Sequence, residues 1–303
     1  MSETPESRVR IDLSARIETV WAGSVSPEMR QAHQIILHAI AGTPSLRNSL
    51  YLKGGALMEL VYNSPRRTTD MDFSYTPFGN PDNDTEETLK MHFNEALQRT
   101  AAKLGFTGIV IGVQSVKRQP QNYPAGSFPA LKFRIAYAKR GTRQEIWFNE
   151  GKASEVVPLD ISFNELLGKP QEIWISDKDS LLAYFLVDLV AEKYRALLQQ
   201  KNRQRNRRQD VYDLEFLLRH YRDELSNLQS EIFKAFTEKS KSRNLSPSPK
   251  SIDEPIVRER ASADWDTLKP ELGSEPLPDF DLCFENVASF YRHLPWSEAE
   301  HPG

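Results

Sequence analysis

Residues 51–75 of this 303-residue chain change their hydrophobic pattern twice, which constrains the fold more than any other stretch. An apolar, strand-like segment ends just before Gly54 and Gly55, and the apolar residues that follow recur at helical spacing. Residues 68–75 then alternate between polar and apolar types, as a half-buried strand does. This succession of strand, glycine turn, helix and strand predicts a domain that mixes helices with a sheet.

The remainder of the N-terminal part continues the same pattern. The first residues are polar and expected to be loose. Ser26 is a cap for a predicted helix at 29–42, and Thr85 a cap for one at 86–105. Alternating β-branched and aromatic residues predict three more strands, at 107–116, 130–139 and 155–164.

From Ser176 onward the apolar residues follow a helical period instead. The predicted helices are 177–200, 209–221, 223–239 and 279–294. A Ser- and Pro-rich loop is expected at 243–255. We therefore predict an α+β protein with a mixed-sheet lobe at residues 1–172 and a helical lobe at residues 173–303.

Composition limits the classes of protein that remain. With 39% hydrophobic and 27% charged residues, the chain can bury a sizeable core and is long enough for two lobes. The single cysteine, Cys283, rules out an internal disulfide and fits a reducing compartment. Neither a signal-like N-terminus nor a bilayer-length apolar run is visible. The expectation is a cytoplasmic protein that makes no membrane contact, and a monomer, because no long apolar seam is left unassigned.

Two acids interrupt the apolar pattern of the strand at 68–75. Residues two apart on a strand share a face, so Asp70 and Asp72 would present their carboxylates together. Such a pair repels itself unless a cation neutralises it, and hard oxygen ligands suit Mg²⁺. The alternative is that one acid faces solvent and the other caps a turn.

The two glycines before the helix suggest what that metal would accompany. Gly54 and Gly55 permit a tight turn and a close approach of the backbone to a ligand, and amides at a helix start attract anions. A phosphate loop and a carboxylate pair together would make a nucleotide site. Taken alone, the glycines also fit an ordinary helix start.

Asp160 interrupts an apolar strand in the same manner as the first two acids. Near a metal, it would complete a two-metal arrangement or act as a base toward an attacking hydroxyl. The alternative is an aspartate at a strand end that makes a local turn hydrogen bond.

Between Lys193 and Arg208 the chain has seven basic residues and no acid, although the net charge of the whole chain is -3. Lys193 lies in an apolar helical stretch and could reach phosphates, while Asp210 opens the next helix. The bland alternative is a solvated loop. Beside a nucleotide site, the later basic residues are predicted to bind NTP phosphates or an RNA backbone. They are Lys201, Arg203, Arg205, Arg207 and Arg208, the "basic run".

Together these motifs resemble those of the AbiEii/AbiGii toxin family, nucleotidyltransferases of the DNA polymerase β-like superfamily that include MenT-like toxins. The glycine turn of that family is matched at Gly54-Gly55, and its Arg-x-Ser-x-Asp-φ-Asp segment at 66–72. Its later strand aspartate is matched at Asp160, its lysine helix at Lys193, and its Asp-φ-φ-Asp-Leu motif at 210–214. The resemblance covers most of residues 30–225, and departs from the family at two positions. Ala56 replaces a frequent hydroxyl, and Gln209 replaces a usual basic residue.

The resemblance implies Mg²⁺-dependent transfer of nucleotides from an NTP to RNA, with the tRNA 3′ end as expected acceptor and blocked translation as the result. It also implies an AbiEi-like antitoxin encoded nearby. Asp70, Asp72 and Asp160 would be the metal ligands, and Lys193 and Asp210 would complete the catalytic set. Gly54, Gly55, Arg66, Thr68 and Lys193 would surround the triphosphate.

Other functions remain open on the sequence. The same fold could modify a protein hydroxyl or a small molecule such as an aminoglycoside, although the basic run would repel a cationic drug. A nucleotide-binding regulator without catalysis is favoured only by Ala56. A plain nucleic-acid-binding module would not need paired aspartates.

Overall fold

The computed structural model describes residues 8–21, 25–120 and 128–296. The chain divides into two compact units. Within the described residues, the first consists of the chain up to Asn63, Arg67–Glu165 and Pro170–Ala183. The second consists of Ser64–Arg66, Leu166–Lys169 and the chain from Tyr184 onward.

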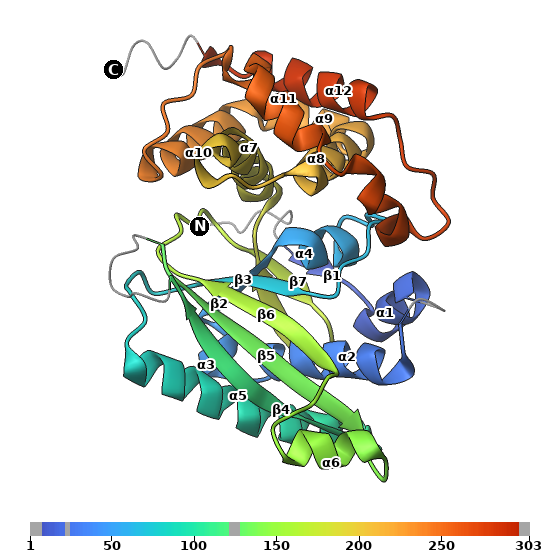
Figure 1. The fold of residues 1–303 in the computed structure, drawn as a ribbon. Helices are drawn as coiled ribbons and strands as arrows, with labels where there is room; N and C mark the ends of the chain where they lie inside the picture. The colour runs from blue at the N-terminus through green and yellow to red at the C-terminus, as the bar shows by residue number, and fades with distance from the viewer. Residues whose placement is uncertain (1–7, 22–24, 121–127, 297–303) are drawn as a thin grey trace. The chain divides into compact units, whose positions relative to one another are not determined.

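A mixed eight-stranded sheet organises the first unit (Figure 1). Its strands follow the order β1-β7-β8-β2-β3-β6-β5-β4. They are β1 (Arg8–Arg10), β2 (Leu50–Lys53), β3 (Met71–Tyr75), β4 (Ile109–Gln119), β5 (Ala130–Lys139), β6 (Val156–Ser162), β7 (Gln171–Trp174) and β8 (Ser180–Ala183). In the middle, β3 pairs antiparallel with β2 and parallel with β6.

Helices cover one face of this sheet. Alternate residues of β5 and β6, such as Phe133 and Leu159, are fully buried. Phe133 packs against Phe93 of α5 (Asn83–Lys103), with ring centroids 5.3 Å apart, and α2 (Pro27–Ala41) lies beside α5 (Figure 1). The other residues of these strands, which point to the opposite face, are polar or charged in several positions. We call that opposite face the open face; it is exposed at Lys117 of β4 and Arg134 of β5, whereas Lys53 of β2 and Ser74 of β3 are buried on it.

Most local predictions for this unit are confirmed. Helix α2 begins after Ser26, whose hydroxyl accepts a hydrogen bond from the Met29 amide. The strands predicted around Asp72, at 107–116, at 130–139 and around Asp160 are β3 to β6. The remaining helices of the unit are α1 (Leu13–Trp21), α3 (Pro44–Arg47), α4 (Gly54–Leu60) and α6 (Arg143–Asn149).

Some predicted boundaries are wrong. Helix α5 starts at Asn83, because Asp82 caps it by accepting the Thr85 amide at 2.7 Å, so Thr85 lies inside the helix. Residues 180–183 form β8, parallel to β2, rather than the start of a helix. Four residues, of which three are apolar, are too few to show a period, so only their pairing decides between strand and helix. The first residues, expected to be loose, lie outside the described residues up to position 7, while β1 and α1 follow directly.

The second unit is helical, as predicted. It contains α7 (Leu186–Arg203), α8 (Arg208–His220), α9 (Arg222–Asn227), α10 (Gln229–Ser242), α11 (Pro255–Ser262) and α12 (Phe280–Arg292), with 3₁₀ turns η2 (Ser251–Asp253) and η3 (Trp265–Leu272). Tyr194 of α7 is fully buried against Tyr291 of α12, with centroids 5.5 Å apart. The predicted α+β class with a mixed sheet and a helical C-terminal part is confirmed. No helix in the described ranges is long and apolar enough to cross a membrane.

Candidate functional site

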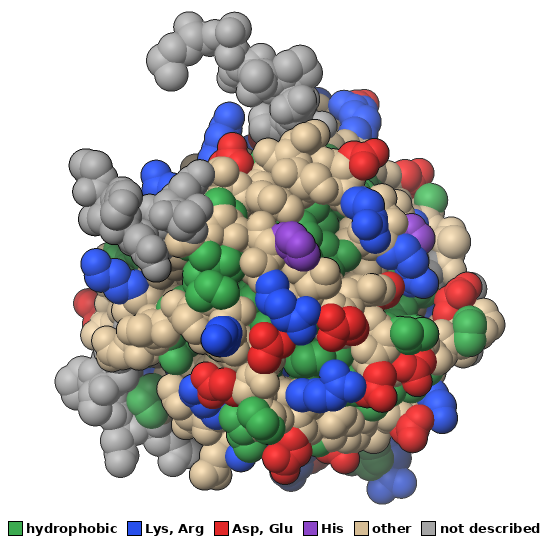
Figure 2. Space-filling model, turned by 90° about the horizontal axis from the view of Figure 1, so that it is seen from above, with side chains coloured by type: hydrophobic (Ala, Val, Ile, Leu, Met, Phe, Trp, Pro, Cys, Tyr) green, Lys and Arg blue, Asp and Glu red, His purple; other side chains and the backbone are tan. Residues whose placement is uncertain are grey.

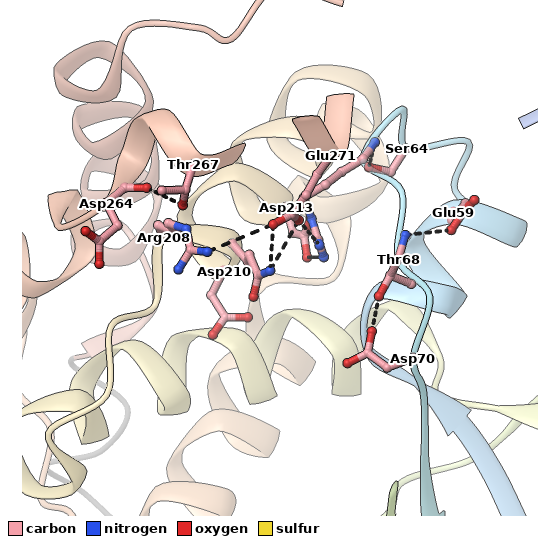
Figure 3. A network of polar contacts seen from close by, with 12 residues as sticks. Glu59, Ser64, Thr68, Asp70, Arg208, Asp210, Asp213, Asp264, Thr267 and Glu271 are labelled. Carbon is pink, nitrogen blue, oxygen red and sulfur yellow. Dashed lines mark hydrogen bonds and ion pairs between the residues drawn. The ribbon is translucent and has the colours of Figure 1, made fainter. Parts of the chain in front are cut away.

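Two of the predicted acids meet on adjacent strands of the first unit. β3 and β6 are parallel and in register, so Asp72 and Asp160 are direct neighbours and point to the same face. Asp70 lies immediately before β3 and is exposed, and its charge acts on Asp72. Its carboxylate accepts a hydrogen bond from the hydroxyl of Thr68, whose amide donates to Glu59 (Figure 3).

A lysine flanks each member of this acid pair. Lys53 of β2 is the cross-strand partner of Asp72, and Lys132 of β5 is the partner of Asp160. The Lys132 Nζ atom lies 2.8 Å from Asp160 Oδ2. These four residues form a line across the open face with the charges plus, minus, minus, plus, and we call it the charged row.

Glu165 adds a further carboxylate at one end of the charged row. Its Oε2 atom accepts hydrogen bonds from Lys53 Nζ at 2.6 Å and from Ser74 Oγ at 2.8 Å. The side chains of Lys53 and Glu165 are only 11% and 9% exposed, so this ion pair is shielded from water. Neither residue was given a role from the sequence alone. Strand pairing places Lys53 beside Asp72, and Glu165 meets Lys53 and Ser74 only in the folded chain.

More acidic than basic side chains act on Asp72, and this excess of negative charge increases its affinity for a proton. Burial, together with the nearby charges of Asp70, Asp160 and Glu165, raises the pKa of Asp72 from 3.8 to about 6, against the opposing effect of Lys53. Among the described residues, no hydrogen bond or ion pair reaches the Asp72 carboxylate. A cation placed there would relieve this accumulated negative charge.

The donor set fits Mg²⁺ in part. Within the described ranges, no group of three or more His, Cys, Asp or Glu side chains is arranged to hold a metal ion. Mg²⁺ commonly takes only one or two carboxylates and completes its shell with water and substrate phosphates. The free carboxylate of Asp72 and the exposed carboxylate of Asp70 meet that requirement. Asp160 is engaged by Lys132, whose side chain is 39% exposed.

Gly54 is required by the acid beside it. It adopts a φ of +67°, and a Cβ atom at this position would lie 2.5 Å from Asp72 Oδ2. Any other residue would therefore face both backbone strain and a collision with the carboxylate. Gly55 follows in the first turn of α4. The glycine turn and the acid of the sequence motif thus pack directly against each other.

The second unit brings together Lys193 and the two acids of α8. The Lys193 Nζ atom lies 2.6 Å from Asp213 Oδ2 and 3.2 Å from Asp210 Oδ1. Arg66 donates to both oxygens of Asp213, through Nε at 2.8 Å and Nη2 at 2.9 Å. All four side chains are largely or wholly buried. Asp213, which the sequence reasoning left without a role, is the centre of this buried network.

The network holds its members in their charged forms. Burial alone would raise the pKa of Asp213, but Arg66 and Lys193 lower it to about 2. Burial alone would likewise lower the pKa of Lys193, but Asp213 and Asp210 raise it. Lys193 is therefore a fixed cation held by two carboxylates.

Arg66 has most of its donors committed inside the second unit. Besides its fork to Asp213, its Nη1 atom donates to Glu271 of η3 at 2.9 Å. Gln209 also donates to Glu271, at 3.2 Å. In this structure the guanidinium of Arg66 is therefore hydrogen-bonded to Asp213 and Glu271 and is not free for the predicted contact with a triphosphate.

The basic run begins at the end of α7 and reaches α8. Lys201 lies 2.7 Å from Glu254, and Arg207 lies 3.6 Å from Asp210. Arg203 and Arg205 are exposed. On the face shown in Figure 2, basic and acidic side chains are intermixed rather than gathered into areas of one sign.

Comparisons with known proteins place these features in a family. The sequence matches the family model "Nucleotidyl transferase AbiEii toxin, Type IV TA system" over residues 35–286, which confirms the resemblance found in the motifs. MenT4, a nucleotidyltransferase toxin from Mycobacterium tuberculosis H37Rv, is similar in structure, with 16% identity and a TM-score of 0.54 over 95% of this chain and 92% of that chain. A candidate nucleotidyltransferase from H. pylori is 15% identical, with a TM-score of 0.42 over 92% of this chain and 100% of that chain. None of the curated proteins compared matches the sequence.

Proposed function

Because the chain belongs to the AbiEii family of nucleotidyltransferase toxins of type IV toxin–antitoxin systems, we propose that it transfers a nucleotidyl group from an NTP to an RNA acceptor. The first candidate acceptor is the 3′ end of tRNA, which would block translation. The observation that supports the proposal most is the acid pair of Asp72 and Asp160 on the open face of the sheet, where the nearby cations do not fully balance the negative charge. We place the reaction in the cytoplasm and expect an AbiEi-like antitoxin to oppose it.

The reaction replaces a phosphoanhydride bond of the NTP by a phosphodiester bond to the acceptor. The acceptor hydroxyl oxygen attacks the α-phosphorus of the NTP, and the bond from that phosphorus to the bridging oxygen of the β-phosphate breaks. Pyrophosphate leaves with the electron pair of that bond. We assign Asp160 to orient the attacking hydroxyl, because its carboxylate lies next to Asp72 and can accept a hydrogen bond from that hydroxyl.

Asp70 and Asp72 are the proposed metal ligands, and Asp160, if released by Lys132, would be a third ligand as the alternative to orienting the hydroxyl. A bound Mg²⁺ would neutralise phosphate charge as the transfer proceeds. The backbone at Gly54 and Gly55 is assigned to the triphosphate, because a side chain at Gly54 would displace Asp72.

The second unit contains the other residues to which we assign roles, apart from Thr68. Lys193 keeps the role of a phosphate-neutralising cation, and Asp210 and Asp213 hold its ammonium group. Arg66 is assigned to position Asp213 rather than to touch the nucleotide, because its donors are engaged by Asp213 and Glu271. Thr68 is assigned to fix Asp70, to which its hydroxyl donates.

The test is nucleotidyl transfer in vitro. The purified protein is incubated with unfractionated bacterial tRNA, Mg²⁺ and each α-labelled NTP separately. Asp72→Asn is the loss variant, and Asp177→Asn is its control, because Asp177 is a highly exposed acid of the same unit. Label on tRNA with the wild type and the control, but not with Asp72→Asn, is the expected result.

Other outcomes separate the alternatives. Label that enters protein or a small molecule instead of RNA would keep the nucleotidyltransferase and refute the RNA acceptor. NTP binding without label on any acceptor would favour a regulator without catalysis. Equal labelling by Asp72→Asn and the wild type would refute the assignment of the acid pair.

A further inference from the structure

The open face becomes basic beyond the acid pair. Continuing the line of the charged row, Lys132 of β5 has Lys117 of β4 as its cross-strand partner. Arg134 lies two residues beyond Lys132 on the same face, opposite Ser115. The residues that these two strand ends place on the open face include three cations and no acid. They are Ser115, Lys117, Gln119, Ala130, Lys132 and Arg134.

The alternation of the strands separates these cations from neighbouring ones. Arg118, one residue after Lys117, points to the helix-covered face and pairs with Glu86 of α5 at 2.7 Å. Lys117 and Arg134 are both exposed, and in the described part of the chain neither takes part in an ion pair or hydrogen bond. Their charges are therefore available to a ligand, whereas that of Arg118 is used inside the fold.

We propose that Lys117, Lys132 and Arg134 bind the phosphate backbone of the RNA acceptor. We call these three residues of the paired strands β4 and β5 the "basic strand pair". This inference rests on the proposed function, since it names the surface that would guide the acceptor to the acid pair. Adjacent strands are about 4.8 Å apart, so the backbones at Lys132 and Lys117 lie about 10 and 14 Å from that of Asp72. An RNA strand whose phosphates follow the line from Lys117 to Lys132 would have its end at Asp160 and Asp72.

Charge favours a polyanion on this surface. Three cations without an acid among them attract phosphates and repel a cationic small molecule. Lys132 is the junction, because it pairs with Asp160 in this structure and can exchange that carboxylate for a phosphate. An acidic protein segment is the other polyanion, and RNA is favoured because the surface continues directly into the proposed transfer site.

The basic run of the second unit is the competing RNA surface. Several of its charges are already balanced, because Lys201 pairs with Glu254 and Arg207 with Asp210. Arg203 and Arg205 are its exposed members, so they provide the direct comparison.

The experiment measures the affinity for labelled, unfractionated bacterial tRNA in the absence of NTP, between about 0.05 and 0.3 M salt. Lys117→Gln/Arg134→Gln tests the basic strand pair, and Lys132 is left intact so that Asp160 keeps its partner. Lys90→Gln/Arg99→Gln on α5 is the matched control, because it removes the same two residue types from the helix-covered side. Arg203→Gln/Arg205→Gln tests the basic run in the same way.

Each phosphate contact contributes a slope of about 0.7 to 0.9 in log affinity against log salt. Loss of two contacts should therefore weaken binding about tenfold near 0.15 M salt and reduce the slope by about 1.5. The α5 control should keep the affinity and slope of the wild type. NTP binding should be unchanged in Lys117→Gln/Arg134→Gln and in the α5 control.

A change of less than twofold in Lys117→Gln/Arg134→Gln would overturn the inference, as would a loss seen only in Arg203→Gln/Arg205→Gln. Absence of tRNA binding by the wild type, or capture of an acidic peptide instead, would overturn it as well. The expected binding result without any nucleotidyl transfer would retain the RNA surface and refute the proposed function. The two hypotheses therefore fail separately.

Discussion

Replacing Asp213 by Asn should destabilise the second unit strongly. Asp213 is fully buried and neutralises two buried cations, Arg66 and Lys193. Its pKa of about 2 lies nearly two units below the ordinary 3.8, which corresponds to about 2 kcal/mol of folding free energy at neutral pH. Removing one partner of a buried ion pair costs about 3 to 5 kcal/mol. We expect a loss near 3 kcal/mol.

The pH dependence gives an independent check of the same reasoning. The folded-state pKa of Asp213 is lowered, so its stabilisation is complete above about pH 4 and is lost as the pH falls toward 2. The wild type should therefore lose stability in this acid range more steeply than Asp213→Asn. Urea unfolding gives the total, and hydrogen exchange of α7 and α8 assigns the loss to the second unit, since two units need not unfold together.

Two further variants sharpen this test. Asp210→Asn should cost less, because Asp210 is partly exposed and Lys193 would keep its shorter contact to Asp213. A triple variant with Arg66→Met, Lys193→Met and Asp213→Leu should recover most of the lost stability, because the three buried charges are removed together, while Asp210 keeps Arg207 at 3.6 Å and Glu271 keeps Gln209 at 3.2 Å. An Asp213→Asn protein that unfolds at the urea concentration of the wild type would refute the stabilising role of the network.

Three other perturbations have expected outcomes. Gly54→Ala should abolish nucleotidyl transfer by displacing Asp72, whereas Gly105→Ala, which has a similar positive φ but open space around it, should cost only about 1 to 2 kcal/mol of stability in thermal unfolding. Because the folded-state pKa of Asp72 is raised to about 6, stability without divalent cations should fall as the pH rises from about 4 to 6. Mg²⁺ should then raise the melting temperature above pH 6 but not at pH 5. Lys239→Met should lower the urea midpoint by leaving Asp188, 2.9 Å away and buried, without its cation, at a cost of about 3 kcal/mol.

The elements that carry the acids could be predicted because their signals are local. Alternation around Asp72 and Asp160, and a helical period after the glycine turn, need only a few neighbouring residues. The partners of these acids could not be predicted in the same way. Lys132 becomes the neighbour of Asp160 through the register of β5 and β6, and the pairing of Arg66 with Asp213 joins residues 147 positions apart. Strand β8 was missed for a related reason, since its pairing with β2 rather than its own sequence makes it a strand.

The aspartates Asp213 and Asp72 are neutralised to opposite degrees, and we infer that this difference separates a structural charge from a functional one. In the second unit, Asp213 has two cations and a pKa lowered to about 2, so its ionised form stabilises the fold. In the first unit, Asp72 has several acids near it and a pKa raised to about 6, so its ionised form opposes the fold. An ionised carboxylate that opposes the fold stays in place only if the surrounding packing holds it there. A cation that binds beside it removes the repulsion between the acids, and this favours binding of the cation. The same argument accounts for Gly54, because a Cβ atom there would collide with Asp72 and displace the carboxylate to which we assign metal binding.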